Sequence, residues 1–215
     1  MGLVERLAAI PYSGAISDIL DEMGFTEQVL PPEIQALEPR QTIAGRVVTA
    51  TGERSLGRSR DDYFLPFLRL LGSIQPGDVI VSQPNDSTTA HFGELSCETA
   101  KLRGGRGVVL NGGMRDVDYA IKLGFPVFAR YRTPLDIVGR WRLTDYNVPI
   151  VIGQTSIQPG DYVVGDRDGV VVIPQGVAED VITRAEELIQ TENLVRKAIL
   201  EGVHPVEAYE RYGRF

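Results

Sequence analysis

Helix-like and strand-like segments alternate in the middle of the chain, over residues 93–130. A helical pattern at 93–104 leads to an apolar strand at 107–111, a Gly-Gly pair that predicts a turn, a second helix at 114–124 and a strand at 126–130. Such alternation is typical of βαβ units, in which helices cover a largely parallel sheet. We therefore expect an α/β protein.

The flanking segments add further elements to this layer. The phrase IQPGD occurs at 74–78 and at 157–161, each time as a Pro-Gly turn before a short apolar strand. The pattern also predicts a helix at 13–23 with Ser13 as N-cap, a strand at 42–50, a helix at 61–72 in which Pro66 must sit early or cause a kink, three strands after a loop around Trp141, and a long helix from about 177 to 200. No linker divides the chain, so residues 1–215 are expected to form one domain with a C-terminal helical tail over about 177–215.

Composition excludes several classes of partner. The chain has 22 Lys plus Arg against 29 Asp plus Glu, a net charge of -7 that repels a phosphate backbone. No segment approaches the roughly 20 apolar residues of a membrane span, and Glu5 and Arg6 interrupt the first residues where a signal peptide is apolar. We expect a cytoplasmic protein that contacts neither nucleic acid nor membrane.

The few soft or titratable side chains limit the chemistry. A single cysteine, Cys97, and two histidines exclude an internal disulfide and a Cys/His zinc cluster, so a metal would bind mainly to oxygen. Cys97 lies in an apolar-spaced run and is expected to be buried. His91 is a candidate base or pocket donor, although a lone loop histidine is more often a simple hydrogen-bonding residue. None of the three lysines has an apolar context that favours Schiff-base formation.

Two short segments are candidates for a site. Residues 93–96, Gly93, Glu94, Leu95 and Ser96, begin a predicted helix, where free N–H groups favour a carboxylate; the alternative is an ordinary cap with an acidic first turn.

The second segment, residues 111–116, follows a buried strand, the usual place of ligands in α/β sheets. Arg115 could bind an oxyanion, and Asp116 offers an oxygen ligand for Mg²⁺ or Mn²⁺. The alternative is an arginine beside an N-cap aspartate, while Asp118 is expected to face solvent.

Several stretches resemble the family that includes the 4-hydroxy-4-methyl-2-oxoglutarate aldolases and the RraA-like regulators of ribonuclease activity. They are AISDILDEMG, TIAGRVVT, IQPGDVIV, HFGELSCETAKLRGGRGVVLNGGMRDVDYA, FPVFAR and IQPGDYVVGDRDGVVVIP, which together extend over nearly the whole chain. In the aldolases an acidic residue, 20 residues and then Arg-Asp mark the catalytic members, and Glu94 precedes Arg115 and Asp116 by that interval. Two positions differ: Glu94 stands where the aldolases have Asp, and Asn111 where an Asp commonly precedes the glycine pair.

The resemblance implies roles for these residues. Gly93 to Ser96 would hold the substrate carboxylate, Arg115 would bind its oxo group, and Asp116 would ligate a divalent metal directly. Glu94 would act as base through water around the metal, and Glu192, or Glu187, of a neighbouring subunit would complete the water shell. The implied fold is a single-domain α/β/β/α sandwich of the phosphohistidine swivelling type, in a homotrimer or homohexamer with sites between subunits.

The expected function is that of a metal-dependent (class II) aldolase. It would cleave 4-hydroxy-2-oxo acids, such as 4-hydroxy-4-methyl-2-oxoglutarate, to pyruvate, with oxaloacetate decarboxylation as a companion activity. Metal and Arg115 together would supply the positive charge that the enolate needs. The main alternative is a non-catalytic RraA-like regulator that binds an RNA-processing enzyme; another is a dehydratase or methyltransferase on the same scaffold, although no glycine-rich motif supports methyl transfer.

Overall fold

The computed structural model describes residues 2–214. Its helices are α1 (Leu3–Ala8), α2 (Ser13–Glu22), α3 (Arg60–Ser73), α4 (Glu94–Leu102), α5 (Val117–Leu123), the 3₁₀ turn η1 (Gln175–Val177), α6 (Ala178–Leu200) and α7 (Pro205–Tyr212). Its strands are β1 (Gln35–Ala36), β2 (Ile43–Arg54), β3 (Asp78–Gln83), β4 (Ala90–Phe92), β5 (Gly107–Met114), β6 (Val127–Arg132), β7 (Trp141–Tyr146), β8 (Ile150–Ile152), β9 (Thr155–Ile157), β10 (Tyr162–Gly165) and β11 (Val170–Ile173).

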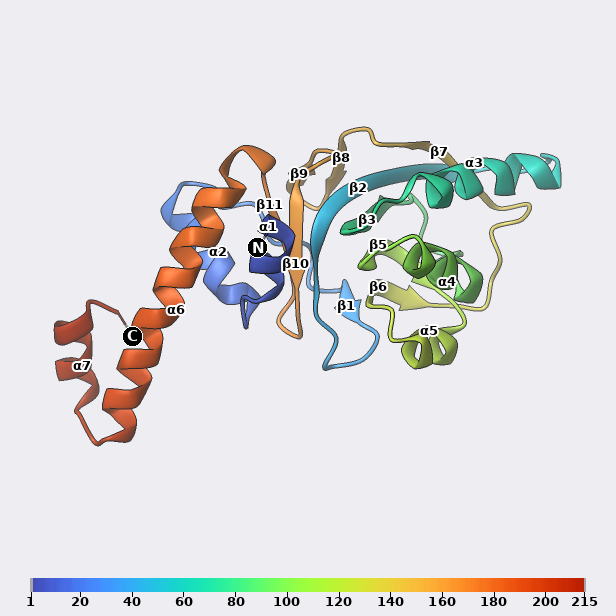
Figure 1. The fold of residues 1–215 in the computed structure, drawn as a ribbon. Helices are drawn as coiled ribbons and strands as arrows, with labels where there is room; N and C mark the ends of the chain where they lie inside the picture. Colours follow the sequence, from blue (N-terminus) through green and yellow to red (C-terminus); the bar gives the residue numbers. More distant parts are fainter. Residues whose placement is uncertain (1, 215) are drawn as a thin grey trace.

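A curled mixed sheet organises the molecule (Figure 1). Its strand order is β1-β6-β5-β3-β2-β10-β11, with β4 paired to β5 and β7 paired to β2. Strands β2, β3, β5 and β6 are parallel, and α4 and α5 form the crossovers from β3 to β5 and from β5 to β6. The βαβ layer predicted from residues 93–130 is confirmed. The α/β/β/α sandwich stays a prediction, because what is observed is this sheet with a separate β8–β9 pair.

Alternating side chains place the core on both faces of the sheet. Val48, Ile80, Val108 and Leu110 pack with residues of α3, α4 and α5 on one face. Their sequence neighbours Val47, Val79, Val81 and Val109 pack on the other face with residues of β8 and β9. This period of two is the geometry of a strand buried on both faces, and it explains why these strands are apolar without interruption.

The two IQPGD segments form equivalent turns, as expected. Asp78 and Asp161 each turn a carboxylate back to accept a hydrogen bond from the backbone N–H of Gln75 and Gln158, at 2.8 and 2.7 Å. The strands that follow, β3 and β10, lie on the two sides of β2. Each aspartate therefore fixes the start of a strand next to the longest strand of the sheet.

Three local predictions need correction. Ser13 is the first residue of α2 and not its N-cap; its N–H and hydroxyl donate to the carboxylate of Asp166 at 2.6 and 2.8 Å, so a distant residue supplies the cap. Trp141 lies in a strand and not in a loop: it is the first residue of β7. Its indole N–H donates a hydrogen bond to the carbonyl oxygen of Pro84 at 2.7 Å. Pro66 is the seventh residue of α3 and so does not sit early in the helix, which starts at a capping box between Ser59 and Asp62; the kink stays a prediction.

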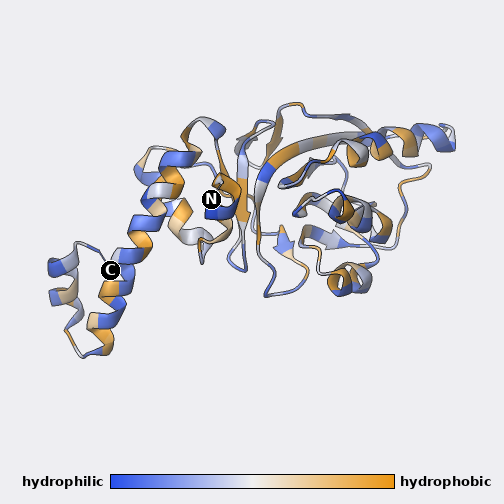
Figure 2. Ribbon diagram, viewed as in Figure 1, coloured by the Kyte–Doolittle hydropathy of each residue, from blue (hydrophilic) through white to orange (hydrophobic). Residues whose placement is uncertain are grey.

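The C-terminal helices lead away from the sheet. The first part of α6 packs against α2, while its later turns extend beyond the body, with α7 alongside them (Figure 1). Apolar and polar residues alternate along α6 (Figure 2), and Leu194 and Leu200 are 53% and 81% exposed. Within residues 2–214, no helix has both the length and the apolar character needed to cross a membrane.

Candidate active site

The two segments singled out in the sequence meet at one pocket of about 330 Å³. The start of α4 forms one side, and the connection from β5 to α5 forms the adjacent side. The lining residues are Phe64, Phe67, Leu68, Leu71, Ala90, His91, Phe92, Gly93, Glu94, Leu95, Ser96, Thr99, Arg115, Asp116, Asp136 and Ile137. A pocket of this size suits a small ligand.

The N-terminus of α4 faces this pocket without a side-chain cap. Gly93 is the N-cap residue, and having no side chain it cannot itself accept a hydrogen bond from the first turn. Within residues 2–214, the N–H groups of Leu95 and Ser96 have no hydrogen-bond partner. Two free donors at the positive end of a helix dipole can hold a carboxylate.

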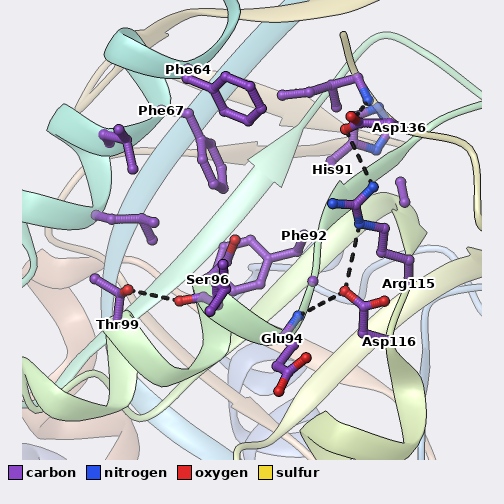
Figure 3. A pocket seen from close by; sticks show the side chains of 16 residues that line it. Phe64, Phe67, His91, Phe92, Glu94, Ser96, Thr99, Arg115, Asp116 and Asp136 are labelled. Carbon is purple, nitrogen blue, oxygen red and sulfur yellow. Dashed lines mark hydrogen bonds and ion pairs between the residues drawn. The ribbon is translucent and has the colours of Figure 1, made fainter.

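Asp116 occupies the N-cap position of α5, but it does not act as a cap. Its backbone is left-handed (φ 56°, ψ 38°), and its side chain accepts no hydrogen bond from α5. Instead, Oδ2 accepts a hydrogen bond from the N–H of Glu94 at 3.2 Å (Figure 3). The simple cap interpretation of this aspartate is therefore wrong, since its carboxylate is aimed across the pocket at the start of α4.

Arg115 lies between two carboxylates (Figure 3). Its Nε is 3.6 Å from Asp116 Oδ2, and its Nη1 is 3.4 Å from Asp136 Oδ1. The three side chains are 38–40% exposed, so the guanidinium is held in place while still open to a ligand. Asp136 was not predicted, because it lies in the loop before β7, where no local pattern marks it.

Glu94 contributes to the site mainly through its backbone. Its N–H is bound to Asp116, whereas its carboxylate makes no hydrogen bond or ion pair with the part of the chain that the structure describes. In Figure 3 this carboxylate points away from the Arg115 guanidinium. Its role as a base stays a prediction.

His91 is a buried residue in the lining of the pocket. Its Nδ1 accepts a hydrogen bond from the N–H of Gly113 at 3.1 Å, so the ring proton is on Nε2, which lies 3.1 Å from Thr89 Oγ1 and 3.3 Å from Asp86 Oδ2. Burial lowers the pKa of His91 to about 4, despite the nearby Asp86 carboxylate. The ring is neutral at pH 7, which fits the hydrogen-bonding alternative.

The Gly-Gly turn predicted at residues 112–113 is wrong. Both glycines lie within β5, at an irregularity in its pairing with β6. A Cβ on Gly112 would lie 2.5 Å from His91 Nδ1, and one on Gly113 would lie 2.4 Å from the carbonyl oxygen of Thr89 and from the Tyr131 ring. The glycines are needed for close packing beside the site.

Helix α3 supplies an apolar wall opposite Arg115. Phe64, Phe67, Leu68 and Leu71 recur at helical spacing and all line the pocket. Figure 3 shows Phe64 and Phe67 on the far side of the cavity from Arg115 and Asp136. The sequence shows the helical spacing of these apolar residues, but only the fold shows that Phe67 and Leu71 belong both to the core and to the pocket wall.

The other predicted acid is remote from this pocket within one chain. Glu192 lies on α6, on the opposite side of the sheet (Figure 1), and accepts a hydrogen bond from the Tyr12 hydroxyl. Its proposed contribution from a neighbouring subunit stays a prediction, as does that of Glu187. Asn111 lies outside the pocket and donates to Gln83 Oε1 at 2.8 Å. Cys97 is buried, and Asp118 is exposed, as expected.

Comparison with known proteins decides the family. The family model described as RraA-like, Aldolase/RraA, matches residues 13–172, which include every pocket residue. The chain belongs to this RraA-like family. A protein of Halalkalibacterium halodurans named "Putative 4-hydroxy-4-methyl-2-oxoglutarate aldolase" is 34% identical over 210 residues, covering 96% of this chain and 92% of the relative.

Solved structures of similar proteins share the fold. RraAS2 of Streptomyces coelicolor, described as an unusual member of the RNase ES inhibitor RraA protein family, is 29% identical with a TM-score of 0.81, covering 91% of this chain and 96% of that one. An uncharacterized protein of Pseudomonas syringae pv. tomato is 28% identical with a TM-score of 0.86, covering 98% and 93%. The chain is thus similar both to proteins named "Putative 4-hydroxy-4-methyl-2-oxoglutarate aldolase" and to a member of the RNase ES inhibitor RraA protein family.

The donor set of the pocket fits a hydrated divalent cation. Within residues 2–214 no three Asp, Glu, His or Cys side chains form a metal-ligand cluster, so Asp116 would be the main direct ligand. Its Oδ1 has no hydrogen-bond partner in the described structure, while Oδ2 is fixed by Glu94 and Arg115. Mg²⁺ commonly binds through one or two carboxylates and keeps several waters, which a partly exposed Asp116 permits.

Proposed function

We propose that this member of the RraA-like family is a divalent-metal-dependent lyase that cleaves 4-hydroxy-2-oxo acids and releases pyruvate. The observation that carries the proposal is the conformation of Asp116. A left-handed aspartate whose side chain does not cap its own helix α5, but instead accepts from the Glu94 N–H of α4 beside Arg115, is a costly arrangement of the backbone. It fits a ligand that carries both a carboxylate and an oxo group.

Each residue has a role in this reaction. The N–H groups of Leu95 and Ser96, with Gly93 leaving room at the cap, hold the substrate carboxylate, and the Arg115 guanidinium binds the 2-oxo oxygen. Asp116 would hold Mg²⁺ or Mn²⁺, and Glu94 would act through water. When bound, the cation would supply positive charge where the enolate develops.

The bond changes follow from these positions. A water oriented by Glu94 accepts the proton of the C4 hydroxyl, C4 becomes a carbonyl carbon, and the C3–C4 electron pair moves into the enolate stabilised by Arg115. A proton returned to C3 gives pyruvate. Decarboxylation of oxaloacetate passes through the same enolate and is a companion activity.

The test is pyruvate release from 4-hydroxy-4-methyl-2-oxoglutarate and from oxaloacetate, by metal-stripped protein with and without Mg²⁺ or Mn²⁺. Asp116→Ala is expected to abolish metal-dependent release, whereas Asp118→Ala, which removes an exposed carboxylate two residues further on, is expected to leave it unchanged. No release from any 4-hydroxy-2-oxo acid with either metal would refute the lyase proposal. It would favour the alternative of a regulator that binds an RNA-processing enzyme.

The proposal includes assembly into a trimer or hexamer, in which Glu192 of a second copy would help to hold the cation through water. Light scattering measures the assembly. In mixed oligomers, Glu192→Gln subunits should restore activity to Asp116→Ala subunits if each site uses both copies. A monomer with full activity would refute this part.

A further inference from the structure

The apolar wall that α3 forms opposite Arg115 determines which kind of chemical group a substrate can place at that end of the pocket. If the carboxylate and oxo group of a 2-oxo acid bind at the start of α4 and at Arg115, the opposite side of the pocket, formed by α3, is left for the substituent on C4. That side is formed by the side chains of Phe64, Phe67 and Leu68 (Figure 3). Phe67 is itself fixed edge-to-face against Phe92, with ring centroids 5.8 Å apart. This surface is apolar and preformed.

The charges of the pocket also oppose a second anionic group. Arg115 is the only cationic side chain among the described lining residues, and two carboxylates already flank it. Glu94, Asp116 and Asp136 against one guanidinium leave an excess of two negative charges, and His91 is neutral. A divalent cation balances that excess, so one substrate carboxylate is accommodated at α4 and a second one, on the α3 side, finds no positive partner.

We propose that this site selects 4-hydroxy-2-oxo acids whose C4 substituent is apolar, an alkyl or aryl group, over substrates with a second carboxylate at that end. 4-Hydroxy-4-methyl-2-oxoglutarate and oxaloacetate carry such a carboxylate and are therefore turned over less efficiently than the apolar substrates. The selection rests on the proposed lyase function, because it concerns the same pocket. Phe64, Phe67 and Leu68 determine it by contact with the C4 substituent. An apolar C4 substituent is stabilised by burial against these side chains. A carboxylate at the same place loses its hydration and finds no hydrogen-bond donor to replace it.

The first experiment compares kcat/KM for pyruvate release from 4-hydroxy-2-oxo-4-phenylbutanoate and from 4-hydroxy-2-oxoglutarate. We expect at least about a tenfold preference for the phenyl compound, which is the discrimination that a small difference in an apolar pocket provides. Equal values, or a preference for the dicarboxylate, overturn the selection while leaving the lyase proposal intact. Release from neither of these compounds, nor from 4-hydroxy-4-methyl-2-oxoglutarate or oxaloacetate, removes the lyase proposal and the selection with it.

The second experiment changes the wall. Leu68→Arg adds a cation to the pocket, and Leu65→Arg adds the same charge to the same helix outside it; the two leucines are 53% and 46% exposed, so both substitutions should be tolerated. We expect Leu68→Arg to shift the ratio of the two kcat/KM values toward the dicarboxylate by about tenfold or more, and Leu65→Arg to leave it within about twofold. An equal shift in both variants, or in neither, overturns the assignment of the wall.

Binding of uncleaved ligands separates recognition from catalysis. Calorimetry with 2-oxo-4-phenylbutanoate and with 2-oxoglutarate, in the presence of Mg²⁺, measures the same preference without any bond cleavage. Tighter binding of the phenyl compound than of 2-oxoglutarate, with a smaller difference in Leu68→Arg, supports the selection even if the native substrate is another 4-hydroxy-2-oxo acid. Tighter binding of 2-oxoglutarate to the unchanged protein refutes it.

Discussion

Gly93 is the point where the geometry of the site can be perturbed with the least effect on the fold. It lies at the N-cap of α4 with φ −154° and ψ −169°, an extended conformation that alanine adopts freely. A Cβ there would lie 2.7 Å from Asp116 Oδ2 and 3.2 Å from Arg115 Cγ. Gly93→Ala therefore adds one methyl group directly against the two side chains on which the proposed chemistry depends.

The expected loss of activity follows from these distances. Ordinary contacts between heavy atoms are near 3.5 Å, so the Asp116 carboxylate has to move by roughly 0.5 to 1 Å. Displacements of that size cost up to about 100-fold in rate, and we expect kcat/KM for pyruvate release to fall by roughly 10- to 100-fold. The free energy of unfolding should change by less than about 1 kcal/mol, because the backbone is unstrained and partly exposed side chains can yield.

The assay pairs steady-state kinetics at saturating Mg²⁺ with thermal unfolding followed by circular dichroism. For a chain of this length, 1 kcal/mol shifts Tm by about 2 to 4 °C, which sets the range expected for Gly93→Ala. Gly72→Ala is the matched control. It lies in α3 with nothing within 4 Å of its added Cβ, so it should keep activity and gain about 0.5 to 1 kcal/mol of stability.

A Gly93→Ala protein with kcat/KM within twofold of the unchanged protein would refute the reasoning. It would mean that Asp116 and Arg115 can shift without consequence, and that their arrangement does not control the reaction. A fall in Tm of more than about 10 °C would refute the claim that the contact is local. Loss of activity with Tm preserved would tie the contact to function.

Three further predictions concern buried or strained groups. Burial lowers the pKa of His91 to about 4, so between about pH 6.5 and 4 the unfolded chain binds a proton that the folded protein does not. The free energy of unfolding should therefore fall by up to about 3 kcal/mol as the pH drops through that range. Urea titrations of His91→Gln should lack this part of the pH dependence. Burial raises the pKa of the Cys97 thiol to about 12, so iodoacetamide at pH 8 should leave the folded protein unmodified and react in urea, which mass spectrometry detects. Asp116→Gly should remove the left-handed strain, keep or raise Tm, and still abolish pyruvate release.

The sequence was sufficient for the elements that carry periodic apolar patterns. The α4 and α5 crossovers were predicted in this way, and the two IQPGD turns from their Pro-Gly motif. The proximity of Glu94 to Asp116 was implied by the family resemblance, and the 3.2 Å bond between them joins residues 22 positions apart. Parallel strands bring the ends of successive units to one edge, so residues at those ends can be placed near one another before the structure is known.

Features that depend on distant contacts were not predictable. A glycine pair indicates either a turn or a close approach, and only the positions of Thr89 and Tyr131 show that Gly113 serves the second purpose. The cap of α2 comes from Asp166, more than 150 positions from Ser13. Asp136 reaches Arg115 from an irregular loop, whose path is set by tertiary packing and not by a local pattern.

The connection between β5 and α5 explains why fold and site depend on each other at Asp116. The strand ends at Met114 and the helix begins at Val117, so two residues have to redirect the chain, and the second of them is left-handed. Glycine would adopt that conformation without cost, whereas an aspartate there costs about 1 to 2 kcal/mol. The bond to the Glu94 N–H offsets part of that cost only because α4 leaves its first turn uncapped. An aspartate at this position is therefore better explained by its carboxylate than by its backbone, which supports the proposal that a ligand binds between α4 and Arg115.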